Sequence, residues 1–182
     1  MRIIGGIAKG RRIFAPVGQD TRPTQDRVRE AIFSILQGTV QGADVLDLFA
    51  GSGALGLEAV SRGARWAVSV DNAQEAMACI RRNIVKLDFE ERMLTMKCDW
   101  QRAVRKLRQM QVRFDLVFLD PPYRMTDTPA ICERLAREGL LRKNALVVIE
   151  HQKGAGPSLP ESFCQEDVRC YGDTGVSFFE YT

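Results

Sequence analysis

From residue 44 onward, short apolar runs alternate with longer amphipathic stretches, and this alternation constrains the fold more than any other feature. The apolar runs have the length of buried strands and lie at 45–49, 66–70, 93–98, 116–119 and 146–149. Apolar residues recur at helical spacing between them, at about 53–62, 73–87, 99–110 and 127–138. Strands that alternate with helices form right-handed units around a mostly parallel sheet that is covered on both faces. The pattern therefore predicts an α/β fold.

The C-terminal end departs from this alternation. Residues 163–171 and 176–181 are extended runs on either side of the turn Gly172-Asp173-Thr174-Gly175. Two such runs joined by a short glycine-containing turn are typical of an antiparallel β-hairpin. We expect this hairpin to close one edge of the otherwise parallel sheet.

The N-terminal segment differs from the rest of the chain in its charge. The first thirty residues hold seven basic and three acidic side chains, whereas the remainder holds 19 basic and 20 acidic, so the net charge of +3 originates here. Residues 3–14 predict a small β-hairpin, and Thr24 is a candidate cap for the helix that follows. We therefore predict a basic appendage of hairpin and helix, 1–42, before a larger domain, 43–182.

Basic side chains of this segment are candidates for contacts with a phosphate backbone or another polyanion. Clustered positive charge attracts nucleic acid by long-range electrostatics. An arm that carries only solvated charge is an equally good interpretation of the charge alone. The candidate RNA-binding residues are Arg2, Lys9, Arg11, Arg12 and Arg22.

Composition excludes several classes of protein. Hydrophobic residues at 45% and charged residues at 27% are values of an ordinary globular chain, which argues against disorder or coiled coil. The apolar runs are far shorter than the roughly 20 residues that span a bilayer, and no apolar signal segment follows Met1, so we expect a cytoplasmic protein without membrane contact. One histidine and five cysteines without a Cys-x-x-Cys pair predict no metal site and nearly exclude a Ser-His-Asp hydrolase.

A glycine turn follows the first apolar run. Residues 45–56 read Val-Leu-Asp-Leu-Phe-Ala-Gly-Ser-Gly-Ala-Leu-Gly, and Asp71 comes twenty residues after Gly51, at the end of the next run. Glycines in this Gly-x-Gly-x-x-Gly spacing let the backbone approach a nucleotide cofactor, and the later acid binds ribose hydroxyls. The pattern by itself does not separate NAD from other nucleoside cofactors.

Asp47 distinguishes between these cofactors. A pyrophosphate is anionic and prefers a bare helix N-terminus, so a carboxylate four residues before the first glycine is an unfavourable neighbour for it. S-Adenosylmethionine has no phosphate and carries an α-ammonium group, which this carboxylate suits; the alternative role for Asp47 is to brace the glycine turn. Asp99, after the third run, is a candidate acceptor for the adenine amine and also a candidate helix N-cap.

The second motif, Asp120-Pro121-Pro122-Tyr123, ends the fourth apolar run, where ligands bind in an open α/β sheet. Two prolines stiffen the turn and lack N–H groups, which leaves its carbonyls free to accept from a ligand. If the Asp120 carboxylate and the Pro121 carbonyl accept both N–H bonds of an exocyclic amine, its lone pair is directed at a methyl group. Tyr123 offers a ring face on which a base can stack. The alternative is a tight turn with an exposed tyrosine.

These residues resemble those of class I methyltransferases that act on exocyclic amines of nucleic acid bases. More narrowly, the chain is similar to the RsmD family, bacterial methyltransferases of guanine N2 in small-subunit (16S) ribosomal RNA. The matching motifs extend over nearly the whole chain: Arg2-Ile3-Ile4-Gly5-Gly6, Arg22-Pro23-Thr24 with Arg27-Val28-Arg29-Glu30-Ala31, the run from Leu48 to Ala59, Asp120-Pro121-Pro122-Tyr123, and Tyr171-Gly172-Asp173-Thr174.

The resemblance implies a Rossmann-like class I methyltransferase sheet, with 43–182 as the catalytic domain and S-adenosyl-L-methionine as the cofactor. Trp100, where many relatives have a smaller residue, and Asn72 depart from the family's adenine pocket. With the residue arguments above, the predicted cofactor-binding residues are Thr24, Asp47, Phe49, Ala50, Gly51, Ser52, Gly53, Asp71, Asn72, Asp99 and Trp100, and the predicted catalytic residues are Asp120, Pro121, Pro122 and Tyr123.

The acceptor base is the point on which alternatives stay open. Asp-Pro-Pro-Tyr also occurs in enzymes that methylate adenine N6 in DNA, but those usually carry a separate target-recognition domain, and the short appendage 1–42 suits a preformed RNA shape better. We expect a monomer that methylates N2 of a specific guanine of 16S ribosomal RNA, within a small ribosomal subunit or an assembly intermediate. The alternatives are adenine-N6 methylation of DNA or RNA, a small NAD-binding oxidoreductase, and a non-catalytic RNA-binding module.

Overall fold

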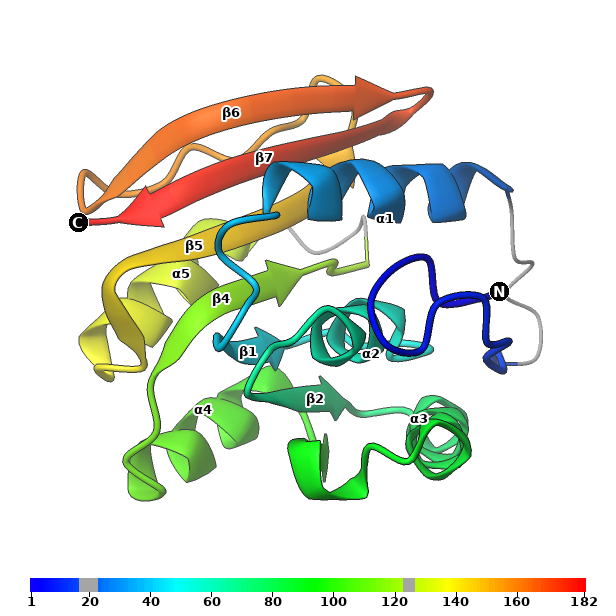
Figure 1. Cartoon of the computed structure of the whole chain (residues 1–182). Coiled ribbons are helices and arrows are strands. Elements are labelled where there is room, and N and C mark those ends of the chain that lie inside the picture. The colour runs from blue at the N-terminus through cyan, green and yellow to red at the C-terminus, as the bar shows by residue number, and fades with distance from the viewer. Residues whose placement is uncertain (17–22, 123–126) are drawn as a thin grey trace.

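Seven strands form a single sheet in the order β3-β2-β1-β4-β5-β7-β6 in the computed structural model, which describes residues 1–16, 23–122 and 127–182 (Figure 1). In chain order the elements are α1 (Pro23–Ile35), β1 (Asp44–Asp47), α2 (Ala54–Ser61), β2 (Trp66–Asp71), α3 (Gln74–Leu87), a 3₁₀ turn (Glu90–Arg92), β3 (Met93–Lys97), α4 (Trp100–Gln109), β4 (Phe114–Leu119), α5 (Thr128–Arg137), β5 (Leu141–Gln152), β6 (Phe163–Tyr171) and β7 (Thr174–Tyr181).

Strands β1 to β5 are parallel, and β7 and β6 add an antiparallel hairpin at the edge next to β5. The order reverses at β1, so β2 and β3 lie on one side of it and β4 and β5 on the other. Loops that leave the carboxyl ends of the strands diverge at such a switch point and leave a crevice there. The mostly parallel sheet and the C-terminal hairpin that the sequence predicts are both confirmed.

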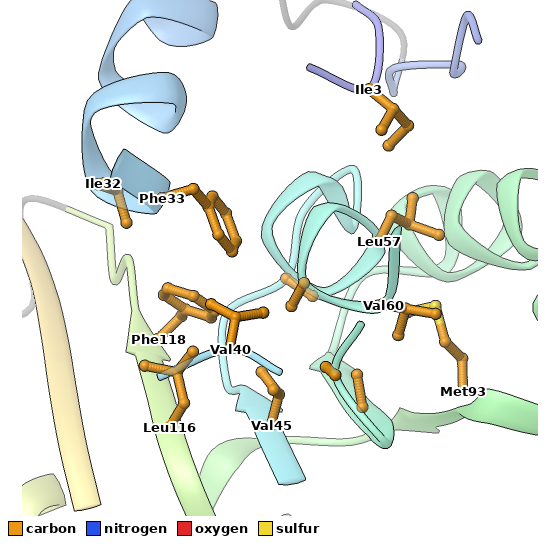
Figure 2. Close-up of a cluster of buried hydrophobic side chains, with 14 of the residues drawn as sticks. Ile3, Ile32, Phe33, Val40, Val45, Leu57, Val60, Met93, Leu116 and Phe118 are labelled. Atoms are coloured by element: carbon orange, nitrogen blue, oxygen red, sulfur yellow. The ribbon is translucent and has the colours of Figure 1, made fainter. Parts of the chain in front are cut away.

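Two layers of helices cover the sheet. Helices α1, α2 and α3 pack with the N-terminal segment on one face, and α4 and α5 pack on the other (Figure 1). On the first face Phe33 of α1 lies against Phe118 of β4 with ring centroids 5.6 Å apart, and Ile3 packs into the same cluster (Figure 2). The N-terminal segment is therefore part of the apolar layer over this face, and the division at residue 42 stays a prediction.

Of two predicted features of the first forty residues, one is confirmed in part and one is wrong. The expected hairpin is short: residues 1–3 pair with residues 10–13 through backbone hydrogen bonds around a bridge between Arg2 and Arg12, whereas side chains of α2 take up the backbone N–H groups of residues 4, 5 and 8. Helix α1 begins at Pro23, so Thr24 lies inside the first turn and is not its cap. Proline is favoured at the first helical position, where its missing N–H has no partner to lose.

Strand β5 is longer than the apolar run 146–149 predicted. It extends from Leu141 to Gln152, because β7 pairs with it from Leu146 to Gln152 and β4 pairs with Leu141. Within the described ranges, no helix is long and apolar enough to cross a membrane.

Candidate active site

A cavity of about 820 Å³ opens at the carboxyl ends of the parallel strands. It brings together eight of the predicted cofactor residues and three of the predicted catalytic residues. Its lining consists of Met1, Gln25, Arg29, Leu48, Phe49, Ala50, Gly51, Ser52, Ala54, Leu55, Asp71, Asn72, Cys98, Asp99, Trp100, Gln101, Asp120, Pro121, Pro122 and Glu150. Asp47 and Gly53 are buried behind this lining. Tyr123 and the side chain of Thr24 lie outside the described residues.

The glycine turn between β1 and α2 has a conformation that only glycine adopts easily. Gly53, the residue before α2, has a φ of 77°, in the left-handed region. A Cβ atom at Gly53 would lie 2.9 Å from Cγ1 of Ile80, so α3 packs directly against the turn. This close packing allows the backbone of the turn to form the floor of the cavity.

Two acidic residues, Asp71 and Asp99, accept hydrogen bonds from backbone N–H groups and so fix the loops that follow β1, β2 and β3. The Asp71 carboxylate accepts hydrogen bonds from the N–H groups of Gly51 and Ala73, both at 2.9 Å. Asp99 is the N-cap of α4 and accepts from the Arg102 N–H at 2.7 Å. The N-cap interpretation of Asp99 is thus confirmed, and its contact with adenine stays a prediction. A carboxylate oxygen has two lone pairs, so both residues keep acceptor capacity for ribose or adenine groups.

Asp47 is a nearly fully buried carboxyl group at the end of β1. Its Oδ2 accepts from the Gly56 N–H at 3.3 Å, which confirms the bracing role, whereas Oδ1 has no protein partner among the described residues. Burial raises the pKa of Asp47 to about 7. A buried, unpartnered carboxylate oxygen is favourable only beside a cation. The residues present therefore fit the α-ammonium group of S-adenosylmethionine.

Asp120 and Glu150 form a carboxyl pair on the other side of the cavity. Leu119 of β4 is in register with Ile149 of β5, which places Asp120 and Glu150 next to each other at the ends of these strands. Asp120 is exposed to the cavity and Glu150 is half-buried beside it. Desolvation by the surrounding protein raises the pKa of both carboxyl groups, and their closeness raises that of Glu150 further, so the pKa of Glu150 lies above that of Asp120. Glu150 is therefore the member of the pair that holds a proton more readily.

Sequence reasoning missed Glu150, although a usable signal was present. Asp71 and Asp120 are acids that directly follow apolar runs, and Glu150 follows the run 146–149 in the same way. Met1, Gln25 and Arg29 were also missed as lining residues, because they come from the N-terminal forty residues and reach the cavity only through tertiary packing.

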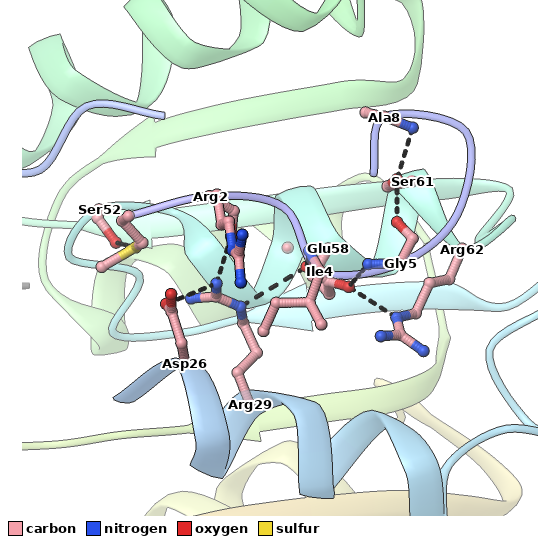
Figure 3. Close-up of polar contacts among 12 residues, drawn as sticks. Arg2, Ile4, Gly5, Ala8, Asp26, Arg29, Ser52, Glu58, Ser61 and Arg62 are labelled. Atoms are coloured by element: carbon pink, nitrogen blue, oxygen red, sulfur yellow. Dashed lines mark hydrogen bonds and ion pairs between the residues drawn. The ribbon is translucent and has the colours of Figure 1, made fainter. Parts of the chain in front are cut away.

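The N-terminal segment is held in place by Glu58 of α2, whose carboxylate is fully buried (Figure 3). Glu58 accepts from the backbone N–H groups of Ile4 and Gly5 at 2.8 and 2.7 Å, and from Nε of Arg62 at 2.7 Å. Gly6 then passes so close to α2 that a Cβ atom there would lie 1.8 Å from the Ser61 carbonyl oxygen. These contacts explain why the pair Gly5-Gly6 is suited to its position beside α2.

Arg29 of α1 connects the same segment to the cavity. It is buried, donates to the Arg2 carbonyl and to Asp26 Oδ1 at 2.5 and 3.1 Å, and has its Nε 3.6 Å from Glu58 (Figure 3). Met1 lies beside it, within reach of the Ser52 hydroxyl, which donates to its sulfur at 3.6 Å. The N-terminal segment and α1 therefore form one rim of the cavity.

The structure groups the predicted RNA-binding residues only in part. Arg2, Lys9 and Arg12 are exposed, and Arg2 and Lys9 line a second hollow of about 460 Å³ together with Arg27. Arg11 is turned toward the end of α3 and forms an ion pair with Asp88 at 3.4 Å. Arg22 lies outside the described residues. Over the part of the chain that the structure describes, no three potential metal-ligating side chains gather at one place.

Comparisons with known proteins extend over nearly the whole chain. The family model described as conserved hypothetical protein 95 matches residues 1–180. The chain is 34% identical over 183 residues to YlbH of Bacillus subtilis (strain 168), which covers 99% of this chain and 98% of the relative. It is 32% identical over 181 residues to ribosomal RNA small subunit methyltransferase D of Escherichia coli (strain K12), with 99% and 89% covered. The solved structure of yhhF from Escherichia coli matches with a TM-score of 0.85 at 30% identity, over 100% of this chain and 97% of that chain.

Proposed function

The chain belongs to the RsmD family of class I, S-adenosylmethionine-dependent RNA methyltransferases, and from this premise we propose that it methylates the exocyclic N2 amine of a specific guanine in 16S ribosomal RNA. One observation carries the proposal at the level of the site. The Asp120-Pro121-Pro122 turn opens into the same cavity as the glycine turn, Asp71 and Asp99. An amine acceptor held at Asp120 would therefore lie beside a nucleoside cofactor.

One side of the cavity, the cofactor side, comprises Asp47, the glycine turn, Asp71, Asp99 and Trp100. It supplies the groups that would bind the cofactor. When bound, S-adenosylmethionine supplies an electrophilic methyl group. Asp47 provides a carboxylate for its ammonium group, Asp71 accepts from ribose hydroxyls, and Asp99 and Trp100 border the adenine position. These residues come from the ends of β1, β2 and β3, so the cofactor would extend across three neighbouring strands.

The opposite side of the cavity, the acceptor side, comprises Asp120, Pro121, Pro122 and Glu150. It would hold the amine that accepts the methyl group. An exocyclic amine is a poor nucleophile, because its lone pair is delocalised into the base. The Asp120 carboxylate and the Pro121 carbonyl accept its two N–H bonds, which favours a pyramidal nitrogen. The same carboxylate stabilises the positive charge that develops on the nitrogen, and preorganised electrostatic stabilisation of this kind usually contributes more to catalysis than any other effect.

The choice of RNA rests on the relatives and on the basic N-terminal segment. The Escherichia coli relative is named for the small-subunit ribosomal RNA that it methylates. The exposed Arg2, Lys9 and Arg12 lie near the cavity rim that Met1 and Arg29 form, and they are suited to phosphates that flank the target base. A cytoplasmic monomer that acts on a small ribosomal subunit or an assembly intermediate agrees with these features.

The test is methyl transfer with identification of the product nucleoside. Radiolabelled S-adenosylmethionine is supplied with undermethylated small ribosomal subunits, free ribosomal RNA or duplex DNA. Label in N2-methylguanosine from RNA is the expected result, and label in N6-methyladenine would replace the acceptor with adenine. Cofactor binding without any transfer would favour a non-catalytic RNA-binding module, and binding of NADH in preference to S-adenosylmethionine would overturn the cofactor.

A further inference from the structure

Three carboxyl groups at the switch point are directed toward the same face of the sheet. Side chains alternate between the two faces along a strand. Val45, Phe118 and Val148 belong to the apolar cluster on the face of α1, α2 and α3. Two residues further along come Asp47 at the end of β1, Asp120 directly after β4, and Glu150 within β5, so the alternation directs all three toward that face.

Glu150 is the member of this group farthest from the cofactor side. The cofactor-binding acids follow β1, β2 and β3, Asp120 follows β4, and Glu150 lies beyond it in β5. The register of β4 and β5, with Leu119 opposite Ile149, places its carboxyl group beside that of Asp120 in the wall of the cavity. The proposed function leaves Glu150 without a role, although it lines the cavity.

Burial and the negative charges beside it explain why the Glu150 carboxyl group holds a proton readily. Desolvation raises its pKa most, Asp120 after β4 raises it further, and Asp47 at the end of β1 adds to this effect. Arg29 from α1 lines the same cavity but is engaged by Asp26 and the Arg2 carbonyl, and β7 presents the apolar Val176 opposite Glu150. Three adjacent carboxylates with one engaged cation favour protonation of one of them.

We propose that Glu150 is a positioning residue for Asp120: its protonated carboxyl group donates to one oxygen of Asp120 and leaves the other oxygen directed at the acceptor amine. This inference rests on one part of the proposed function, namely that the group that accepts the methyl is an amine. The amine nitrogen would form a bond to the methyl carbon while the bond between that carbon and the cofactor's sulfonium sulfur breaks, and the bonding electron pair would stay on the sulfur of the departing thioether. The nitrogen would then lose one N–H proton, which Asp120 accepts and releases to water through the open cavity. Glu150 keeps its own proton throughout.

Two substitutions of Glu150 distinguish a role as hydrogen-bond donor to Asp120 from a role of its size or its charge. Glu150→Gln cannot ionise but retains an N–H donor toward Asp120, whereas Glu150→Ala removes the donor. We expect Glu150→Gln to keep a kcat close to that of the wild type, and Glu150→Ala to lose about 10- to 100-fold in kcat with little change in KM for RNA, as for a misplaced catalytic group. Glu133→Gln, an exposed glutamate of α5, is the matched control and should change nothing.

The pH profile provides a readout that a structural role would not change. The value of kcat/KM for the cofactor at saturating RNA reports ionisations in the enzyme before the cofactor binds. The wild type should lose activity on an alkaline limb as Glu150 loses its proton, and Glu150→Gln should lack the part of that limb that Glu150 causes. Identical profiles in both proteins, or a Glu150→Gln variant as inactive as Glu150→Ala, would overturn the inference.

A direct measurement keeps the inference testable if the acceptor differs from guanine or if the wild type transfers no methyl group. Carbon-13 NMR of the side-chain carboxyl groups at neutral pH should show Glu150 protonated, and Asp120→Asn should shift its titration. A Glu150 carboxyl that is ionised at neutral pH sinks the positioning role, whereas absence of transfer by the wild type counts only against the proposed function. Melting temperatures of all variants confirm that each is folded.

Discussion

The two sides of the cavity hold their acidic groups in different ways. On the cofactor side, Asp47, Asp71 and Asp99 each accept from a backbone N–H of a neighbouring loop or helix. On the acceptor side, Asp120 and Glu150 lie beside each other, and each affects the pKa of the other. Backbone N–H groups stay in place whatever the pH, but a carboxyl pair changes its charge and its contact when it loses a proton.

This difference suggests that one side of the cavity serves cofactor binding and the other serves the reaction. Under the proposed function, the cofactor side serves binding, because its acids are oriented before any ligand arrives and little ordering is left to do. The acceptor side then serves a reaction that releases a proton, because the pKa of Glu150 lies above that of Asp120. Substitutions on the two sides should therefore separate affinity for the cofactor from turnover.

Asp120→Ala should have the largest effect and should act on turnover alone. It removes the group that accepts from the amine, and removal of one such preorganised hydrogen-bonding group typically lowers kcat by about 10²–10³. Methyl-transfer assays measure the decrease, and calorimetric titration with S-adenosylmethionine should show cofactor binding retained. An Asp120→Ala enzyme with full activity would contradict the assignment of the acceptor side.

Asp47→Asn should act on the cofactor side and should depend on pH. Because burial raises the pKa of Asp47 to about 7, the group is largely neutral below that pH and anionic above it, so wild-type affinity for S-adenosylmethionine should increase as pH rises through this value. The variant should bind about 10- to 100-fold more weakly at alkaline pH, in line with the loss of a charge-assisted hydrogen bond of about 1.5–3 kcal/mol. Titrations at several pH values check this, and a variant with the same pH dependence as the wild type would rule out Asp47 as its source.

Gly53→Ala should weaken the cofactor side through the backbone. The left-handed φ and the contact with Ile80 should together cost about 1–3 kcal/mol of stability, with weaker cofactor binding. Gly42→Ala is the matched control, since Gly42 has a φ of 76° but open space around it, at the opposite end of β1. Denaturant unfolding and cofactor titration of both variants test the expectation. Equal cofactor affinity in both would show that the turn tolerates a side chain.

The smallest effect is expected from the N-terminal charges. Replacing Arg2, Lys9 and Arg12 by alanine should reduce RNA affinity a few-fold and flatten the slope of log affinity against log salt by about 0.7–0.9 for each phosphate that is no longer bound. Cofactor affinity should stay the same. The control removes three positive charges elsewhere, at Arg105, Lys106 and Arg137 on α4 and α5. If both triple variants change the salt slope equally, the N-terminal segment has no special part in RNA binding.

Much of this organisation was predictable from local patterns. The alternating runs predicted β1 to β5 and α2 to α5, the turn-linked extended runs predicted β6 and β7, and the helical spacing after Thr24 predicted α1, all to within a few residues apart from β5. The class I methyltransferase fold is confirmed. The glycine turn and the Asp120 motif were also identifiable, because each is a short segment that directly follows an apolar run. The periodicity of buried residues extends over only a few positions, so it can be recognised directly in the sequence.

The contacts between distant segments were decided by the tertiary structure. Glu58 binds backbone groups more than fifty positions away, which shortens the expected hairpin and packs its loop on α2. Glu150 meets Asp120 only because β4 and β5 pair in one particular register, and β5 owes its length to β7. The sequence by itself therefore determined which residues form strands, helices and turns, because these depend on neighbours along the chain. Which carboxyl groups lie side by side, and what forms the rim of the cavity, depended on strand register and on side-chain contacts that only the folded chain brings together.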